Sequence, residues 1–132
     1  MPLVLDASVA LGALFPDERS SQADAILAQL QSDEAVVPAH WWFETRNALI
    51  VAERRGRVSR DAVTAFLIKL NDLPVSIAAL PDEKAVFALA HDHRLTFYDA
   101  AYLELAKREE MTLATFDREL IAAAKAEQVP LA

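Results

Sequence analysis

Residues 3–11, Leu-Val-Leu-Asp-Ala-Ser-Val-Ala-Leu, decide the fold of this 132-residue chain. The apolar run at residues 3–5 has a β-branched centre, which is typical of a strand buried on both faces of a parallel sheet. Asp6 ends this run, and residues 7–11 then have the composition of a helix. A buried strand that leads directly into a helix indicates an α/β protein.

The same alternation of short strands and helices continues along the chain. Further strands are predicted at residues 35–37, 75–77 and 112–115, with a closing strand around Val129 and Leu131. A break is predicted at residues 16–18, and a long helix at residues 40–55 that stops at Gly56. Other helices are expected to begin near Ser20 or Ser21, Ser59, Asp82, Asp99 and Asp117. We therefore expect one three-layer α/β/α domain over residues 1–132, with a central parallel sheet of about five strands.

The composition limits the class of protein and the kinds of functional site that the chain can form. Hydrophobic residues make up 54% of the chain and charged residues 25%, which fits a globular protein rather than a disordered one. The absence of cysteine excludes disulfides, thiolate metal sites and a cysteine nucleophile, and two glycines are too few for a glycine-rich phosphate loop. No apolar run is long enough for a membrane span and no signal peptide is evident, so we expect a cytoplasmic protein with no membrane contact.

The net charge of −7 is distributed unevenly. Residues 40–60 hold five arginines and two glutamates, which gives this segment a charge of +3 and the rest of the chain −10. Arginines at the end of a helix either contact phosphates of a nucleic acid or simply suit the helix dipole. The candidate phosphate contacts are Arg46, Arg54, Arg55 and Arg57.

Four acids fall where a parallel sheet places a ligand site, which is beyond the carboxyl ends of its strands. Asp6 follows the first strand, Asp117 follows the strand at residues 112–115, and Asp99 starts a helix. Glu44 lies about one turn into the helix after the second strand, and its long side chain can reach back. Each aspartate is also a plausible helix N-cap, and Glu44 a favourable first-turn acid, so both interpretations remain open at this point.

The residues around these acids resemble the motifs of the PIN-domain family. The resemblance lies in Leu-Val-Leu-Asp-Ala-Ser at residues 3–8, Glu-Thr-Arg-Asn-Ala-Leu at 44–49, Tyr-Asp-Ala-Ala-Tyr-Leu at 98–103 and Thr-Phe-Asp-Arg-Glu-Leu at 115–120. The four segments occur in the order of the family, and their spacing covers nearly the whole chain. The length also looks like that of the small VapC-type toxins of type II toxin–antitoxin pairs.

This resemblance implies a metal-dependent endoribonuclease that uses Mg²⁺ or Mn²⁺, with RNA as substrate, a cognate antitoxin protein as inhibitor and a homodimer as assembly. Hard divalent cations prefer oxygen ligands and activate water for phosphodiester hydrolysis. The residues that would bind the metal and carry catalysis are Asp6, Glu44, Asp99 and Asp117. The side chains that would support a carboxylate or a bound water are those of Ser8, Asn47 and Thr115. The four candidate arginines named above would then contact RNA.

Two readings outside the toxins stay open: a PIN-fold nuclease that processes RNA or acts on DNA, and a non-catalytic binding module. Other α/β families fit less well. A haloacid-dehalogenase-like phosphatase needs a second aspartate where Ser8 stands. A response-regulator receiver domain needs an acidic pair after the first strand and a late lysine, whereas Asp6 stands alone and Thr115 leads to Asp117.

Overall fold

The centre of the fold is a parallel sheet of four strands in the order β3-β2-β1-β4. The strands are β1 (Leu3–Leu5), β2 (Ala35–Val37), β3 (Val75–Ile77) and β4 (Thr112–Ala114). The structure is a computed structural model that describes residues 2–15, 17 and 20–132. Leu3 of the central strand β1 pairs with Ala35 on one side and with Thr112 on the other. All three residues of β1 are fully buried, as its apolar sequence predicts.

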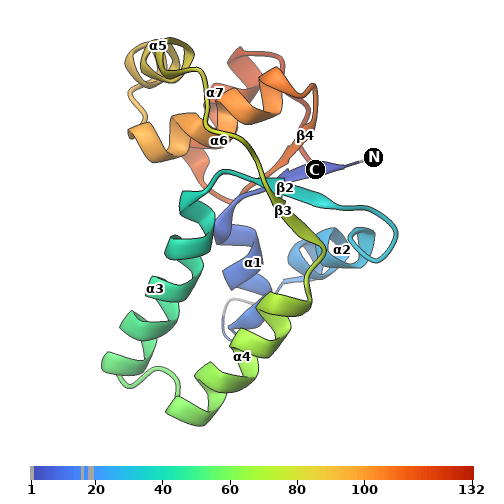
Figure 1. Cartoon of the computed structure of the whole chain (residues 1–132), viewed down its shortest axis with the longest axis vertical. Coiled ribbons are helices and arrows are strands. Elements are labelled where there is room, and N and C mark those ends of the chain that lie inside the picture. Colours follow the sequence, from blue (N-terminus) through green and yellow to red (C-terminus); the bar gives the residue numbers. More distant parts are fainter. Residues whose placement is uncertain (1, 16, 18–19) are drawn as a thin grey trace.

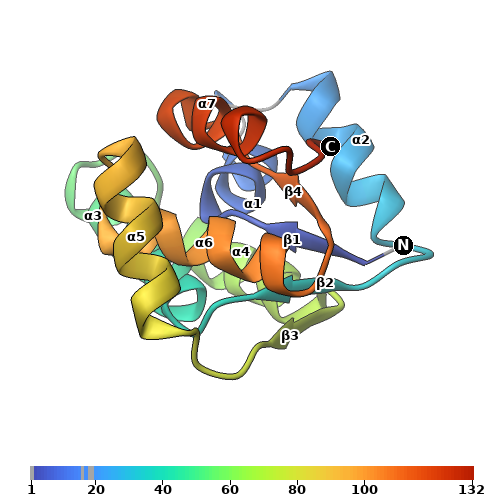
Figure 2. The same ribbon diagram turned by 90° about the horizontal axis from the view of Figure 1, so that it is seen from above.

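Helices cover both faces of this sheet. They are α1 (Ala7–Leu14), α2 (Ser21–Gln29), α3 (His40–Arg54), α4 (Arg60–Asp72), α5 (Glu83–His93), α6 (Phe97–Arg108) and α7 (Arg118–Ala126). In Figure 1 the sheet separates α5, α6 and α7, drawn above it, from α1, α2, α3 and α4 below it. Figure 2 shows the strands side by side with α6 over the centre of the sheet, where α6 contacts β1 and β4. The expected three-layer α/β/α architecture is therefore confirmed.

Local signals in the sequence set most helix ends. Ser20 and Ser59 cap α2 and α4 by accepting hydrogen bonds from the backbone N–H groups of Ala23 and Ala62, each at 3.1 Å. Gly56 has a φ of 71°, and the N–H of Arg57 donates to the carbonyl of Ala52 at 2.9 Å. This is the hydrogen-bond pattern with which a left-handed glycine ends a helix, so the stop after α3 follows from the sequence.

Two expectations need correction. The closing strand near Val129 is reduced to a single parallel bridge between Leu113 and Leu131, so the sheet has four strands and not about five. Pro130, beside that bridge, has no N–H to add to a ladder. Asp99 does not cap α6, because Thr96 is the N-cap and accepts the N–H of Asp99 at 3.1 Å. The break predicted at residues 16–18 falls mainly on residues outside those described.

The hydrophobic core extends over both faces of the sheet, with residues from the helices on each side. Its most continuous part is α6, where seven consecutive residues from Ala100 to Ala106 are buried and Tyr102 is the largest fully buried side chain. α6 contacts both β1 and β4, the two strands that are followed in the chain by Asp6 and Asp117. Among the described residues, no helix is both long and apolar enough to cross a membrane.

Candidate active site

Asp6 is the buried centre of the candidate site. It follows β1 and its side chain is 5% exposed. It occupies the N-cap position of α1, but its carboxylate makes no cap hydrogen bond. Instead, Oδ2 accepts hydrogen bonds from the hydroxyls of Ser8 and Thr115, each at 2.7 Å. Charge-assisted hydrogen bonds of this length hold a carboxylate in one orientation.

Both hydroxyls also accept a backbone N–H from the turn between β4 and α7. Ser8 Oγ accepts from Phe116 at 3.1 Å, and Thr115 Oγ1 accepts from Asp117 at 3.0 Å. The two hydroxyls therefore connect this turn to Asp6, and they bring Asp117 to the same edge of the sheet. Asp117 caps α7, with Oδ1 accepting the N–H of Leu120 at 2.9 Å. Of the three aspartates read as possible caps, Asp117 alone has a side chain that caps its helix.

Glu44 reaches the site from α3 and is held from α6. The hydroxyl of Tyr102 donates to Glu44 Oε1 at 2.7 Å. His40, one turn earlier on α3, places Nε2 at 3.4 Å from the same oxygen. That contact lacks hydrogen-bond geometry, and His40 Nε2 is buried with no hydrogen-bond partner among the described residues. The ring of His40 packs between those of Tyr98 and Tyr102, with centroids 5.3 and 5.0 Å away.

Asp99 lies in the first turn of α6, half-buried. Because Thr96 provides the cap, the Asp99 carboxylate is not needed to satisfy the N-terminal N–H groups of this helix. The helix dipole favours an acid in a first turn, but burial and the charges of Asp117 and Asp6 outweigh this effect and raise the pKa of Asp99. The Asp99 carboxylate is therefore free to bind a ligand, and a cation would stabilise its charge.

Electrostatics join the acids into one cluster. Burial raises the pKa of Asp6, and the negative charge of Asp117 raises it further against the two hydroxyl donors. Burial also raises the pKa of Glu44, with contributions from Asp6 and Asp99. The pKa of Asp99 rises through burial and then through the charges of Asp117 and Asp6. The charge of at least one other acid thus raises the pKa of Asp6, of Glu44 and of Asp99, as expected for a site that a cation would neutralise.

The four acids are suitable ligands for a hard divalent cation, although they lie too far apart to enclose an ion as they stand. All four side chains offer carboxylate oxygens, the ligands that Mg²⁺ and Mn²⁺ prefer. Within the residues that the structure describes, no three acidic or histidine side chains are close enough to hold a metal ion as they stand. Asp6, Glu44 and Asp117 are instead each hydrogen-bonded through one carboxylate oxygen to the protein. Each has a second oxygen with which to bind a cation.

The remaining sequence candidates differ in their surroundings. Asn47 is exposed on α3, one turn after Glu44, and stays a prediction. Arg46 turns toward α4, where it donates to Asn71 Oδ1 at 3.1 Å, and its guanidinium lies 4.5 Å from the Trp42 ring centroid. Arg57 pairs with Asp17 at 2.8 Å. Intramolecular contacts thus engage two of the four arginines proposed to meet RNA.

Arg54 and Arg55 are exposed at the carboxyl end of α3. Arg55 and Arg57 both line a groove of about 540 Å³ between α1 and α3. Ser8, which donates to Asp6, lines the same groove. Basic side chains therefore border a groove that extends to the acidic cluster.

The structure brings three further residues to the site through contacts that the sequence did not predict. Tyr102 holds Glu44, His40 packs against both, and the charge of Glu119 contributes to the raised pKa of Asp99. The spacing of Tyr102 and His40 from the acids could have indicated their place at the site. Tyr102 stands three residues after Asp99 and His40 four residues before Glu44, so each shares a helix face with a cluster acid.

Comparison with known proteins identifies the family of this chain. Residues 3–126 match the family model described as PIN domain. The chain is 35% identical over 123 residues to the protein named ribonuclease VapC3 of Pyrobaculum aerophilum, covering 91% of this chain and 92% of that one. The crystal structure of PAE2754 from the same organism superposes with a TM-score of 0.70 at 27% identity, covering 93% of this chain and 87% of that one. VapBC2 from Rickettsia felis, bound to a DNA fragment from its promoter, has the same fold, with a TM-score of 0.69, 15% identity and coverage of 100% and 98%. The model match and the VapC3 relative together show that this chain belongs to the PIN-domain family.

Proposed function

We propose that this chain is a metal-dependent endoribonuclease and the toxin of a type II toxin–antitoxin pair. One observation carries the proposal: burial and the charges of neighbouring acids, Asp117 among them, raise the pKa values of Asp6, Glu44 and Asp99 at the carboxyl edge of the sheet. A site of this kind is destabilised until a cation binds. Membership in the PIN-domain family and the relative named ribonuclease VapC3 support the choice of a nuclease that cuts RNA.

We propose Mg²⁺ or Mn²⁺ as the metal. The four acids offer oxygen donors of hard character and the chain has no cysteine, which favours these ions over softer ones. At a separation of ~5 Å and an effective dielectric of ~20, two carboxylates repel by roughly 3 kcal/mol. Relief of that repulsion would contribute to binding. Metal affinity should accordingly fall at low pH, where protons compete for the same oxygens.

The proposed roles follow from burial and hydrogen bonding. Asp6 and Asp99 are the main ligands, and Glu44 and Asp117 complete the site directly or through water. A bound divalent cation would supply positive charge for the phosphate and the leaving oxygen and would activate the attacking water. Ser8 and Thr115 fix the direction of Asp6 by donating to Oδ2. Tyr102 does the same for Glu44, and it cannot itself act as a base because burial strongly raises its pKa.

Four further points belong to this proposal. The phosphate backbone of RNA would approach along the groove bordered by Arg55, with Arg54 beside it. Residues 1–132 would act as one PIN domain, because the family model covers residues 3–126. The partners would be a cognate antitoxin protein and a second copy of this chain in a homodimer. The protein would act in the cytoplasm, where its RNA substrate is.

Purified protein without antitoxin tests the proposal. It should cut circular single-stranded RNA in Mg²⁺ or Mn²⁺, leaving 5′-phosphate and 3′-hydroxyl ends. A circular substrate has no ends, so its cleavage distinguishes an endonuclease from an exonuclease. EDTA and Asp6→Asn should each abolish cleavage. Cleavage that survives Asp6→Asn would refute the site, and cleavage of DNA alone would favour a nuclease outside toxin–antitoxin pairs.

A further inference from the structure

A second cavity, of about 220 Å³, lies beside the acidic cluster. It is formed by the first turns of α3 and α6 together with the segment between β3 and α5. His40 contributes from α3, Phe97 and Tyr98 contribute from α6, and Leu80 and Pro81 contribute from the connecting segment. The lining is mainly apolar and aromatic. None of the four proposed metal ligands is part of it.

The cavity and the acidic cluster share a wall. His40 lines the cavity with its ring, and its Nε2 lies 3.4 Å from Glu44 Oε1. Tyr98 directly precedes Asp99 in α6. A group seated in this cavity would therefore lie next to whatever occupies the cluster. The cavity and the cluster are as close as neighbouring side chains, so adjacent parts of one ligand could occupy both.

The aromatic side chains at the mouth are exposed. Tyr98 is 62% exposed, and the ring of His40 contacts it at a centroid distance of 5.3 Å with a tilt of 55°. Leu80, beside it, is 84% exposed. Phe97 is 39% exposed and is held by an edge contact of 5.1 Å with Phe87. Exposed aromatic rings that are fixed from behind offer a flat surface on which a planar ligand can stack.

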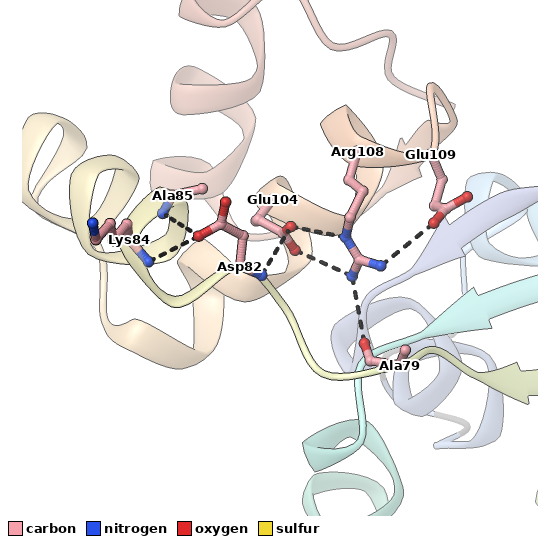
Figure 3. Close-up of polar contacts among 7 residues, drawn as sticks. All are labelled: Ala79, Asp82, Lys84, Ala85, Glu104, Arg108 and Glu109. Atoms are coloured by element: carbon pink, nitrogen blue, oxygen red, sulfur yellow. Dashed lines mark hydrogen bonds and ion pairs between the residues drawn. The ribbon is translucent and has the colours of Figure 1, made fainter.

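The charged residues of the lining are bonded to one another and to the segment between β3 and α5, as Figure 3 shows. Arg108 donates to both carboxylate oxygens of Glu104, at 2.8 and 3.3 Å, and to the carbonyl of Ala79 at 3.5 Å. Glu104 Oε1 also accepts the N–H of Asp82 at 3.4 Å. These bonds fasten the segment from Ala79 to Asp82 onto α6, so the cavity is preformed. Its charged groups are paired with one another, so they leave the interior suited to an apolar, planar group.

We propose that this cavity binds one unstacked nucleobase of the RNA strand, next to the phosphate that is cut, with Tyr98 as the stacking surface. This inference rests on the proposed function. Proteins that act on single-stranded RNA hold splayed bases by stacking them on aromatic side chains. Because the charged groups of the wall are already paired, stacking rather than hydrogen-bond readout would dominate. The cavity would thus position the strand while tolerating more than one base.

The test uses nucleosides, which carry no phosphate and need no metal. The ¹⁵N-labelled full chain in EDTA is titrated with adenosine, with uridine and with ribose as the base-free control. Both nucleosides should shift the amide resonances of Leu80, Tyr98 and Ala101 saturably, and ribose should not. Tyr98→Ala should weaken nucleoside binding by roughly 5- to 100-fold, the usual range for loss of one stacking contact.

Phe43→Ala is the matched control. Phe43 is 68% exposed and directly precedes Glu44, as Tyr98 precedes Asp99, but it lies outside the cavity. Its removal should leave nucleoside affinity unchanged. Equal shifts with ribose, equal loss in both variants, or no saturable shift would overturn the inference. So would dissociation of a dimer by Tyr98→Ala without a change in nucleoside binding, which would make this surface an interface between copies.

Cleavage of RNA by the wild-type protein, measured in parallel, separates the two proposals. Cleavage without nucleoside binding refutes the base cavity alone and leaves the nuclease proposal standing. Nucleoside binding without cleavage of any RNA refutes the proposed function and supports a base-binding cavity. If both hold, Tyr98→Ala should raise KM by the same 5- to 100-fold range and change kcat less, because the lost contact positions substrate.

Discussion

Thr115→Val should destabilise the protein through Asp6. The substitution keeps the shape of the side chain and removes a hydroxyl that is buried with Asp6 at the end of β4. That hydroxyl donates to Asp6 Oδ2 at 2.7 Å and accepts the N–H of Asp117 at 3.0 Å. Loss of a hydrogen bond to a charged group costs roughly 1.5–3 kcal/mol, and an unsatisfied N–H adds about 1 kcal/mol. We expect the free energy of unfolding at pH 7 to fall by roughly 2.5–4 kcal/mol.

Urea denaturation followed by circular dichroism measures this change, with Thr112→Val at the other end of β4 as control. Thr112 is only half-buried, so its substitution should change the free energy of unfolding by no more than about 0.5 kcal/mol. The Asp6→Asn background supplies the decisive comparison. Neutral hydrogen bonds are about half as strong as charge-assisted ones, so the Thr115→Val penalty should shrink by about 1 kcal/mol there.

The penalty should also depend on pH. The Thr115 hydroxyl lowers the pKa of Asp6 against the effect of burial. Its stabilising contribution is therefore present above the pKa of Asp6 and is lost as the pH falls through that pKa. An equal penalty in both backgrounds and at every pH would refute the reasoning, because Thr115 would then act by packing or through Asp117 alone.

Three further predictions follow from the same cluster. Tyr102→Phe removes the donor to Glu44 and should weaken Mn²⁺ binding roughly 10-fold in an electron paramagnetic resonance titration; unchanged affinity would mean that Tyr102 only packs. In EDTA at pH 7, Asp6→Asn should raise the free energy of unfolding, because burial raises the pKa of Asp6 and so destabilises its carboxylate in the folded protein. The folded protein binds this proton more tightly than the unfolded chain does, so the advantage should vanish as the pH falls below about 4; an advantage that persists there argues against the charge effect. Arg54→Ala combined with Arg55→Ala should reduce the slope of log K for RNA against log salt by about 1.4, and an unchanged slope would make both residues ordinary solvated charges.

Much of the fold could be predicted because it depends on short-range signals. The apolar run before Asp6, the glycine that ends α3, and the serines before α2 and α4 each act on their own neighbourhood. The convergence of the acids followed from one general property, that parallel strands end at the same edge of a sheet. The roles of the individual carboxylates remain predictions.

The features that were missed depend on contacts between distant segments. Arg46 turns away from the groove because Asn71, 25 residues later, receives its guanidinium. The hydroxyl of Tyr102 donates to Glu44, which is 58 residues away in the chain. The cap of α6 was a different kind of error, because Thr96 stands three residues before Asp99 and the signal was present in the sequence.

An anomalous-diffraction map of crystals of the full chain soaked in Mn²⁺ tests the central claim most directly. The proposed function predicts one strong peak enclosed by the carboxylates of Asp6, Glu44, Asp99 and Asp117, and its loss in Asp99→Asn crystals. A peak at another place, or no peak at saturating Mn²⁺, would contradict the assignment of these four acids as the metal site.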